Sequence, residues 1–355
     1  MWLNSIKTNY YIPKGQFKIM LELLKTICEV PGVSGREHNI AAKIKEILTP
    51  YVDEVRIDNL GNVIGVIRGT APADKKKKLM FSAHMDEVGF MVTKVDDNGY
   101  MHAVNIGGPN MISASYREVV FDNGCRGMLV PTCGNDGAGQ VGKCVVDVGA
   151  KNKEEAEKVA MPGDTFTVAA GIIPLCGTRY AGHPVDDRIG CAILIDAARI
   201  LSEGERPAND IFCVFSVQEE INGNGGLTAA YQEMPDYGIA IDVCGVGDMV
   251  GSDPMVMKLG DGAAIKVKDS TIMCDWDLVK RMFKLAEENN IKYQREILLA
   301  GGTDATSMQK VAMGIKAGCI SIPMRYLHTS AEAFDMEDAV ACRDLTVAMC
   351  RDAEI

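Results

Sequence analysis

IFCVFSVQEE, residues 211–220, is the stretch of sequence that decides the fold. An apolar run of this length that ends in polar residues is typical of a strand buried on both faces of a sheet. Comparable runs alternate with helical patterns after Asp186, among them RIGCAILIDAARILSE at 188–203 and DWDLVKRMFKLAEEN at 275–289. This alternation predicts an α/β fold, with a mostly parallel sheet and helices on both of its faces.

Side chains that bind metals stand at the ends of three predicted strands: His84 with Asp86 beyond it, the pair Glu219 and Glu220, and Asp242. The carboxyl ends of parallel strands meet at one edge of a sheet, so these residues are expected to converge. A buried strand has little reason to end in two carboxylates unless a cation holds them, because unpaired buried charge is costly. Two further candidates come from the segments 184–190 and 322–328, which contain Asp186 and His328.

Each candidate ligand has a plainer explanation when it is taken alone. Glu219 and Glu220 would be a solvated loop, and His84 would be a core histidine that makes one hydrogen bond. The spacing of His84 and Asp86 favours a metal site, because it places a carboxylate where it can orient the imidazole.

The pattern of apolar and polar residues changes between Val88 and Val168, where short alternating strands and Gly-rich turns replace the helical pattern. Such spacing predicts a small antiparallel, barrel-like β domain inserted into the larger one. Nearer the N-terminus, Ser34 stands three residues before Glu37, which is the spacing of a capping box at the start of a helix. The expected domains are a loosely ordered extension over 1–19, a discontinuous catalytic domain over 20–88 and 182–355, and the inserted β domain over 89–181.

Composition excludes several classes of protein. The 355 residues carry a formal net charge of -11, which disfavours nucleic acid as a partner because phosphate backbones would be repelled. No apolar stretch approaches the length of about 18 residues that a membrane span needs, and no cleavable signal is visible, so a cytoplasmic protein without a membrane partner is expected. The 12 cysteines contain no C-x-x-C pair and are expected to be buried, reduced thiols.

Six motifs in order along the chain resemble those of the dinuclear metalloaminopeptidases. The family is that of the tetrahedral aminopeptidases, which also contains glutamyl aminopeptidases and proteins labelled endoglucanase M. The resemblance runs from about Met20 to the C-terminus and rests on AHMDE at 83–87, PVDDRIG at 184–190, VQEE at 217–220, IDV at 241–243, GGTDA at 301–305 and IPMRYLH at 322–328.

This resemblance implies a role for each candidate residue. Asp186 would bridge two divalent metal ions, zinc, cobalt or manganese, with His84 and Asp242 on one ion and Glu220 and His328 on the other. It further implies that Glu219 is the general base, that Asp86 orients His84, and that the substrate pocket includes Gly301, Gly302, Thr303 and Asp304.

The implied activity is removal of N-terminal residues from peptides by an aminopeptidase in which two metals activate water. The implied assembly is a homo-oligomer, in which dimers form a tetrahedral dodecamer and the inserted domain supplies contacts. Two departures from the family pattern stand out. The loop after Glu220, INGNGGLTAA, is long, and His183 is either a stray ligand or, as we expect, a loop residue.

Other functions stay open from the sequence. A metal-dependent deacylase or carboxypeptidase of the wider superfamily would be separated by testing N-acylated substrates. An endoglucanase is disfavoured because aromatic residues, which stack on sugars, make up only 6% of the chain. A binding or assembly protein on the same fold would have no need of a complete ligand set. An acid-selective pocket would need a nearby cation, for which Arg325 and Lys258 are candidates.

Overall fold

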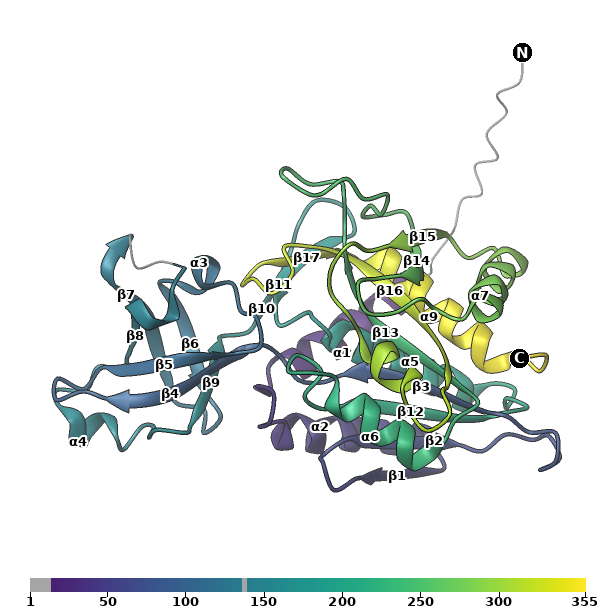
Figure 1. Cartoon of the computed structure of the whole chain (residues 1–355), viewed down its shortest axis with the longest axis horizontal. Coiled ribbons are helices and arrows are strands. Elements are labelled where there is room, and N and C mark those ends of the chain that lie inside the picture. The colour runs from purple at the N-terminus through teal and green to yellow at the C-terminus, as the bar shows by residue number, and fades with distance from the viewer. Residues whose placement is uncertain (1–13, 136–138) are drawn as a thin grey trace, which may run out of the picture.

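The computed structural model describes residues 14–135 and 139–355. Figure 1 shows a large body built from a sheet and helices, and a smaller β body that projects from one side of it. The smaller body is formed by the chain from β4 (Gly89–Val95) to β9 (Thr165–Val168).

An 11-stranded sheet forms the centre of the large body. Its central strands are parallel and follow the order β12 (Asp210–Ser216), β3 (Lys78–His84), β13 (Tyr237–Gly245) and β16 (Lys316–Arg325). The flanks are largely antiparallel and comprise β1 (Glu54–Ile57), β2 (Val63–Ile67), β17 (Glu332–Asp335), β11 (Arg179–His183), β10 (Gly171–Pro174), β14 (Ala263–Lys268) and β15 (Tyr293–Ile297). The parallel centre confirms the predicted α/β fold, and the flanks make the sheet a mixed one.

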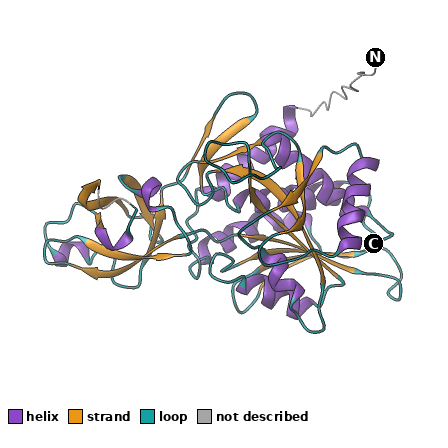
Figure 2. Ribbon diagram, turned by 45° about the horizontal axis from the view of Figure 1, so that its top comes forward, coloured by secondary structure: helices purple, strands orange, loops and turns teal. Residues whose placement is uncertain are grey.

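Helices cover both faces of this sheet (Figure 2). One face carries α1 (Lys14–Cys28), α2 (His38–Leu48), α5 (Arg188–Glu203), α7 (Trp276–Glu288) and α9 (Met336–Arg351), with the short η1 (Thr49–Tyr51) after α2. The other face carries α6 (Asn224–Glu233) and α8 (Asp304–Gln309). The central strands are buried on both sides, so their apolar side chains join those of the helices in one main core.

The smaller body is a closed barrel with a core of its own. Phe166 lies at its centre, with its ring centroid 5.1 Å from that of Phe90 and 5.2 Å from that of Phe121. The remaining elements of the barrel are β5 (Met101–Ile106), α3 (Met111–Ala114), β6 (Arg117–Phe121), β7 (Arg126–Asn135), η2 (Val141–Lys143), β8 (Cys144–Asp147) and α4 (Lys153–Ala156). The barrel has the antiparallel architecture that the alternating sequence predicts.

The structure draws two boundaries differently from the sequence. The barrel strands end at Val168, whereas β10 and β11 pair with the edge of the large sheet through β17, so residues 171–181 do not belong to the barrel. The alternating sequence pattern of β10 and β11 resembles that of the barrel strands. Only the strands with which they pair show that they belong to the large sheet. Helix α1 begins at Lys14, and Phe17 packs against the main core, so the first helix starts before Met20. Residues 1–13 lie outside the described part of the chain.

Two further expectations concern the cysteines and the absence of a membrane span. Among the described cysteines only Cys125 and Cys176 are exposed, which agrees with thiols that pack as small apolar groups. Within the described ranges, no helix is long and apolar enough to cross a membrane.

Candidate active site

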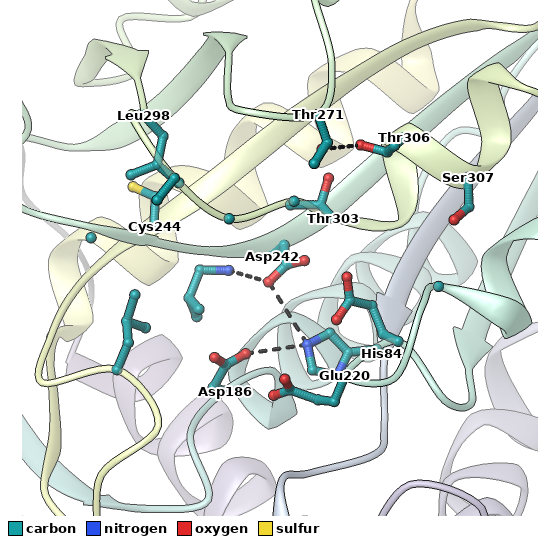
Figure 3. A pocket seen from close by; sticks show the side chains of 18 of the residues that line it. His84, Asp186, Glu220, Asp242, Cys244, Thr271, Leu298, Thr303, Thr306 and Ser307 are labelled. Atoms are coloured by element: carbon teal, nitrogen blue, oxygen red, sulfur yellow. Dashed lines mark hydrogen bonds and ion pairs between the residues drawn. The ribbon is translucent and has the colours of Figure 1, made fainter. Parts of the chain in front are cut away.

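The predicted ligands converge at the carboxyl edge of the parallel strands, as Figure 3 shows for four of them. They line a cavity of about 620 Å³. Each comes from a different segment: His84 ends β3, Asp186 lies between β11 and α5, Glu220 follows β12, Asp242 lies inside β13, and His328 follows β16. The expectation that a strand ends at Asp242 is wrong, because β13 continues to Gly245.

Asp186 stands between two groups of ligands. Its Oδ1 lies 3.2 Å from His84 Nε2, which is itself 3.8 Å from Asp242 Oδ1. Its Oδ2 lies 3.4 Å from His328 Nε2, which is itself 3.3 Å from Glu220 Oε2. The side chains thus form two three-ligand groups that share a single carboxylate.

Both imidazoles are oriented through Nδ1, the nitrogen that does not face the other candidate ligands. His84 Nδ1 lies 3.1 Å from the carbonyl oxygen of Asp86, and His328 Nδ1 lies 3.2 Å from that of Gly108. A ring that donates from Nδ1 to a carbonyl keeps Nε2 directed at the opposite partner, which is how metal-binding histidines are commonly held.

Asp86 holds the turn that carries Glu219 and Glu220. Its fully buried carboxylate accepts hydrogen bonds from the backbone N–H of Glu219 at 3.0 Å and of Glu220 at 3.2 Å, and its Oδ1 lies 3.5 Å from His84 Nδ1. Ser34 Oγ donates to it at 2.6 Å.

The predicted capping box is therefore wrong. Helix α2 starts after Glu37 without a side-chain cap, and Ser34 is drawn to the buried charge of Asp86 instead. Glu37 in turn accepts from the backbone N–H of Gly35 and of Gln218.

The electrostatics of the site indicate a shortage of positive charge. Burial raises the pKa of Glu219 well above its usual value, and burial and Asp186 raise that of Asp242 to about 8. Burial opposes the charged form of His328, yet hydrogen bonds to Asp186 and Glu220 outweigh it and raise its pKa to about 12. Among the three carboxylates, the pKa of Asp186 is lowered by the two imidazoles it faces, whereas those of Glu220 and Asp242 are raised, chiefly by burial. Added positive charge would therefore favour the charged forms of Glu220 and Asp242. Nitrogen and oxygen donors without thiolate suit zinc, cobalt or manganese, so the donor set fits divalent ions.

The four residues predicted for the substrate pocket differ in their positions. Gly301, Gly302 and Thr303 line the cavity, whereas Asp304 is buried behind it, where its Oδ2 accepts from Ser82 and Ser216.

His183 is neither a ligand nor a loop residue. It is the buried last residue of β11, and its Nε2 lies 3.2 Å from Glu87 Oε2. Arg325, a candidate cation for an acid-selective pocket, is paired with Asp248 at 2.6 Å, and neither it nor Lys258 is among the lining residues.

Two residues of the site were not singled out from the sequence. Lys310, at the end of α8, is exposed and is the cationic side chain among the described lining residues that could meet an acidic substrate group. Glu332, the first residue of β17, contacts two ligand-bearing segments through its carboxylate. Neither role could be predicted from the sequence, because a single lysine or glutamate does not form a recognisable motif.

Comparisons with known proteins agree with this geometry. The M42 glutamyl aminopeptidase family matches residues 61–345. A putative aminopeptidase from Acetivibrio thermocellus is 40% identical over 321 residues, which are 90% of this chain and 94% of that protein.

Among solved structures, aminopeptidase APDkam598 from the archaeon Desulfurococcus kamchatkensis has a TM-score of 0.89 at 31% identity over 95% of each chain. The TET1 peptidase of Pyrococcus horikoshii, described as able to assemble into a tetrahedron or a large octahedral shell, has a TM-score of 0.84 at 28% identity over 94% of this chain and 99% of its own. The family match and the 40% identity, each spanning most of the chain, show that the protein belongs to the M42 glutamyl aminopeptidase family.

Proposed function

We propose that the protein is an aminopeptidase that holds two divalent metal ions at the shared carboxylate of Asp186. The observation that carries the proposal is the position of its two oxygens, one 3.2 Å from His84 and the other 3.4 Å from His328. A carboxylate that faces two separate ligand groups is suited to join two ions, and family membership supports a metal-dependent hydrolase.

The ligands divide between the two positions by distance. His84 and Asp242 would hold one ion with Asp186, and Glu220 and His328 would hold the other. Such a pair of ions supplies Lewis acidity that polarises a peptide carbonyl and makes water a stronger nucleophile. Zinc, cobalt and manganese are the candidates, since the donors are nitrogen and oxygen.

Glu219 is the residue proposed to move the proton. It lines the same cavity as the candidate ligands, and its backbone N–H donates to the Asp86 carboxylate. Burial raises its pKa, in the direction that a group needs if it is to accept a proton from water and return it to the leaving amine near neutral pH.

The cavity wall opposite the ligands is proposed to receive the first side chain of the peptide. Thr303 and Leu298 lie on that side (Figure 3), and Gly301 and Gly302, which precede Thr303, also line the cavity. Lys310 would favour an acidic first residue through charge attraction.

The test is a panel of aminoacyl and N-acetylaminoacyl substrates, run with each candidate metal and after chelation. Hydrolysis of the free-amine substrates that chelation abolishes and metal restores is expected. Hydrolysis of the acetylated substrates alone would overturn the aminopeptidase assignment in favour of a deacylase. Glu219→Gln should lose about 100-fold to 10,000-fold in turnover while metal content stays unchanged; retained turnover would overturn the assignment of the base.

We further propose that the barrel contributes contacts in a closed homo-oligomer. Its surface exposes large apolar side chains, including Val104, Ile112 and Met128, which are costly to leave in water. A mass measurement in solution tests this, and the dodecamer implied by the family resemblance is the expected result. The TET1 peptidase, described as able to assemble into a tetrahedron, supports this expectation. A monomer at micromolar concentration would refute it.

A further inference from the structure

Glu332 connects two segments that carry ligands and are far apart in the sequence. Its carboxylate is buried, with 1% of the residue exposed. Oε1 accepts a hydrogen bond from the backbone N–H of His328 at 3.1 Å. Oε2 accepts from the backbone N–H of Val185 at 2.7 Å and of Asp186 at 3.2 Å.

From this geometry we infer that Glu332 is a positioning residue, which holds Asp186 and His328 at the separation needed to bind one metal ion between them. The inference rests on the proposed function, because it concerns the same pair of ligands. It adds a residue that is not itself a ligand and does not line the cavity.

The position of Glu332 is set by the sheet, not by the ligands. Strand β17 pairs with β11, and Glu332 lies opposite Gly182, four residues before Asp186. The same strand pairs with β16, which leads to His328. The Glu332 carboxylate is therefore carried by paired strand backbone and lies between the two loops that hold Asp186 and His328. The strand pairing thus fixes how far apart these two residues lie.

The backbone of His328 needs such support. Its φ is 58°, in the left-handed region that a residue with a side chain seldom adopts. Its N–H is held by Glu332, and its carbonyl oxygen accepts from the backbone N–H of Asn110 at 2.9 Å. Since the imidazole is held separately by the carbonyl of Gly108, the loop keeps several contacts when Glu332 is altered.

A charge-pairing role explains the contacts of Glu332 less well. The imidazole nitrogen that pairs with Glu332 is His183 Nδ1, 3.9 Å from Oε2, whereas the other nitrogen of that ring lies 3.2 Å from Glu87 Oε2. The closest partners of Glu332 are instead three backbone amides, and two of these belong to the ligands themselves.

Glu332→Gln is the sharpest variant, because it keeps the shape and replaces one acceptor oxygen with a donor. The amide oxygen can serve Val185 and Asp186 or else His328, but not both sides. Zinc affinity and stoichiometry would be measured by equilibrium dialysis against a competing chelator. We expect the affinity for one of the two ions to fall by about 10-fold to 100-fold, as for other residues that orient ligands.

The matched control is Asp338→Asn. Asp338 is equally buried, and its carboxylate accepts from the backbone N–H groups of Gly260 and Gly262, both at 2.7 Å, but it contacts no ligand. This variant should be less stable to urea than the wild type yet bind zinc with wild-type affinity.

Three outcomes would overturn the inference. One is wild-type zinc affinity in a folded Glu332→Gln protein, and another is an equal loss of affinity in Asp338→Asn. If Glu332→Gln does not fold, Glu332→Asp, whose shorter side chain cannot span both sides, replaces it in the same measurement; failure of both to fold would assign Glu332 a structural role. A wild-type protein that binds no more than one ion would refute the two-metal proposal itself, whereas a two-ion wild type with an unaffected variant refutes only the role of Glu332.

Discussion

Replacing Asp86 by Asn gives the most direct test of how the site is supported. The carboxylate accepts hydrogen bonds from Ser34 Oγ and from the backbone amides of Glu219 and Glu220, and it lies beside His84. Burial raises the pKa of Asp86, but hydrogen bonds from His84, Ser34 and the Glu219 amide outweigh this and lower it, so the group is charged. In Asn, one of the two acceptor oxygens becomes a donor that faces other donors.

The size of the effect follows from these bonds. A hydrogen bond to a charged group contributes about 1.5–3 kcal/mol, so the loss of one or two lowers the free energy of unfolding by about 1.5–6 kcal/mol. Because the same carboxylate holds the turn of Glu220 and its Oδ1 lies 3.5 Å from His84 Nδ1, metal affinity should fall by about 10-fold to 100-fold. Ser34→Ala removes a single bond and should lower stability by about 1–3 kcal/mol, with a smaller effect on metal.

The assay combines urea unfolding of the metal-free protein with zinc competition against a chelator. Comparison of Asp86→Asn, Ser34→Ala and the remote control Asp338→Asn separates support of the site from general stability. The reasoning is refuted if Asp86→Asn binds zinc as tightly as the wild type, or if Ser34→Ala has the larger effect of the two.

Three further predictions concern other residues. Asp186→Ala should lose both ions, and a variant that retains two by elemental analysis would contradict the shared role. Lys310→Met should lower the ratio of kcat/KM for glutamyl over leucyl substrates by about 5-fold, since exposed charge pairs contribute up to about 1 kcal/mol; an unchanged ratio would count against it. Lys266 is fully buried between Glu296 at 2.7 Å and Asp269 at 3.1 Å. Lys266→Met should therefore cost about 3–5 kcal/mol of stability in urea, because it leaves two buried carboxylates without their cation.

The local pattern of the chain was sufficient to predict the fold class and to select candidate ligands that lie together in the structure. Apolar runs such as 211–217 predict buried strands because a strand covered on both faces has no polar side. Ligands that follow such runs must converge where parallel strands end, which is how His84, Glu220 and Asp242 come to line a single cavity. Their separation into two groups around Asp186 was implied only by resemblance until the distances were known.

Misassigned elements share a physical cause. Strands β10 and β11 alternate like those of the barrel. They belong to the large sheet because β11 pairs with β17, more than 140 residues away, and β10 pairs with β11. Ser34 has the spacing of a helix cap but bonds to Asp86, because a buried carboxylate is the stronger acceptor. Neither partner can be found from spacing, since both are distant in the sequence.

By itself, the sequence determined the α/β class, the inserted barrel and the side chains that could bind metal, because periodicity and residue type record burial and donor chemistry locally. Only the tertiary structure decided that Asp86 and Glu332 hold the backbone of ligand-bearing segments, and that Lys310, not Arg325, lines the cavity. These roles depend on which loops lie together at the edge of the sheet. Long-range strand pairing and hydrogen bonds decide this, and no local sequence pattern encodes them.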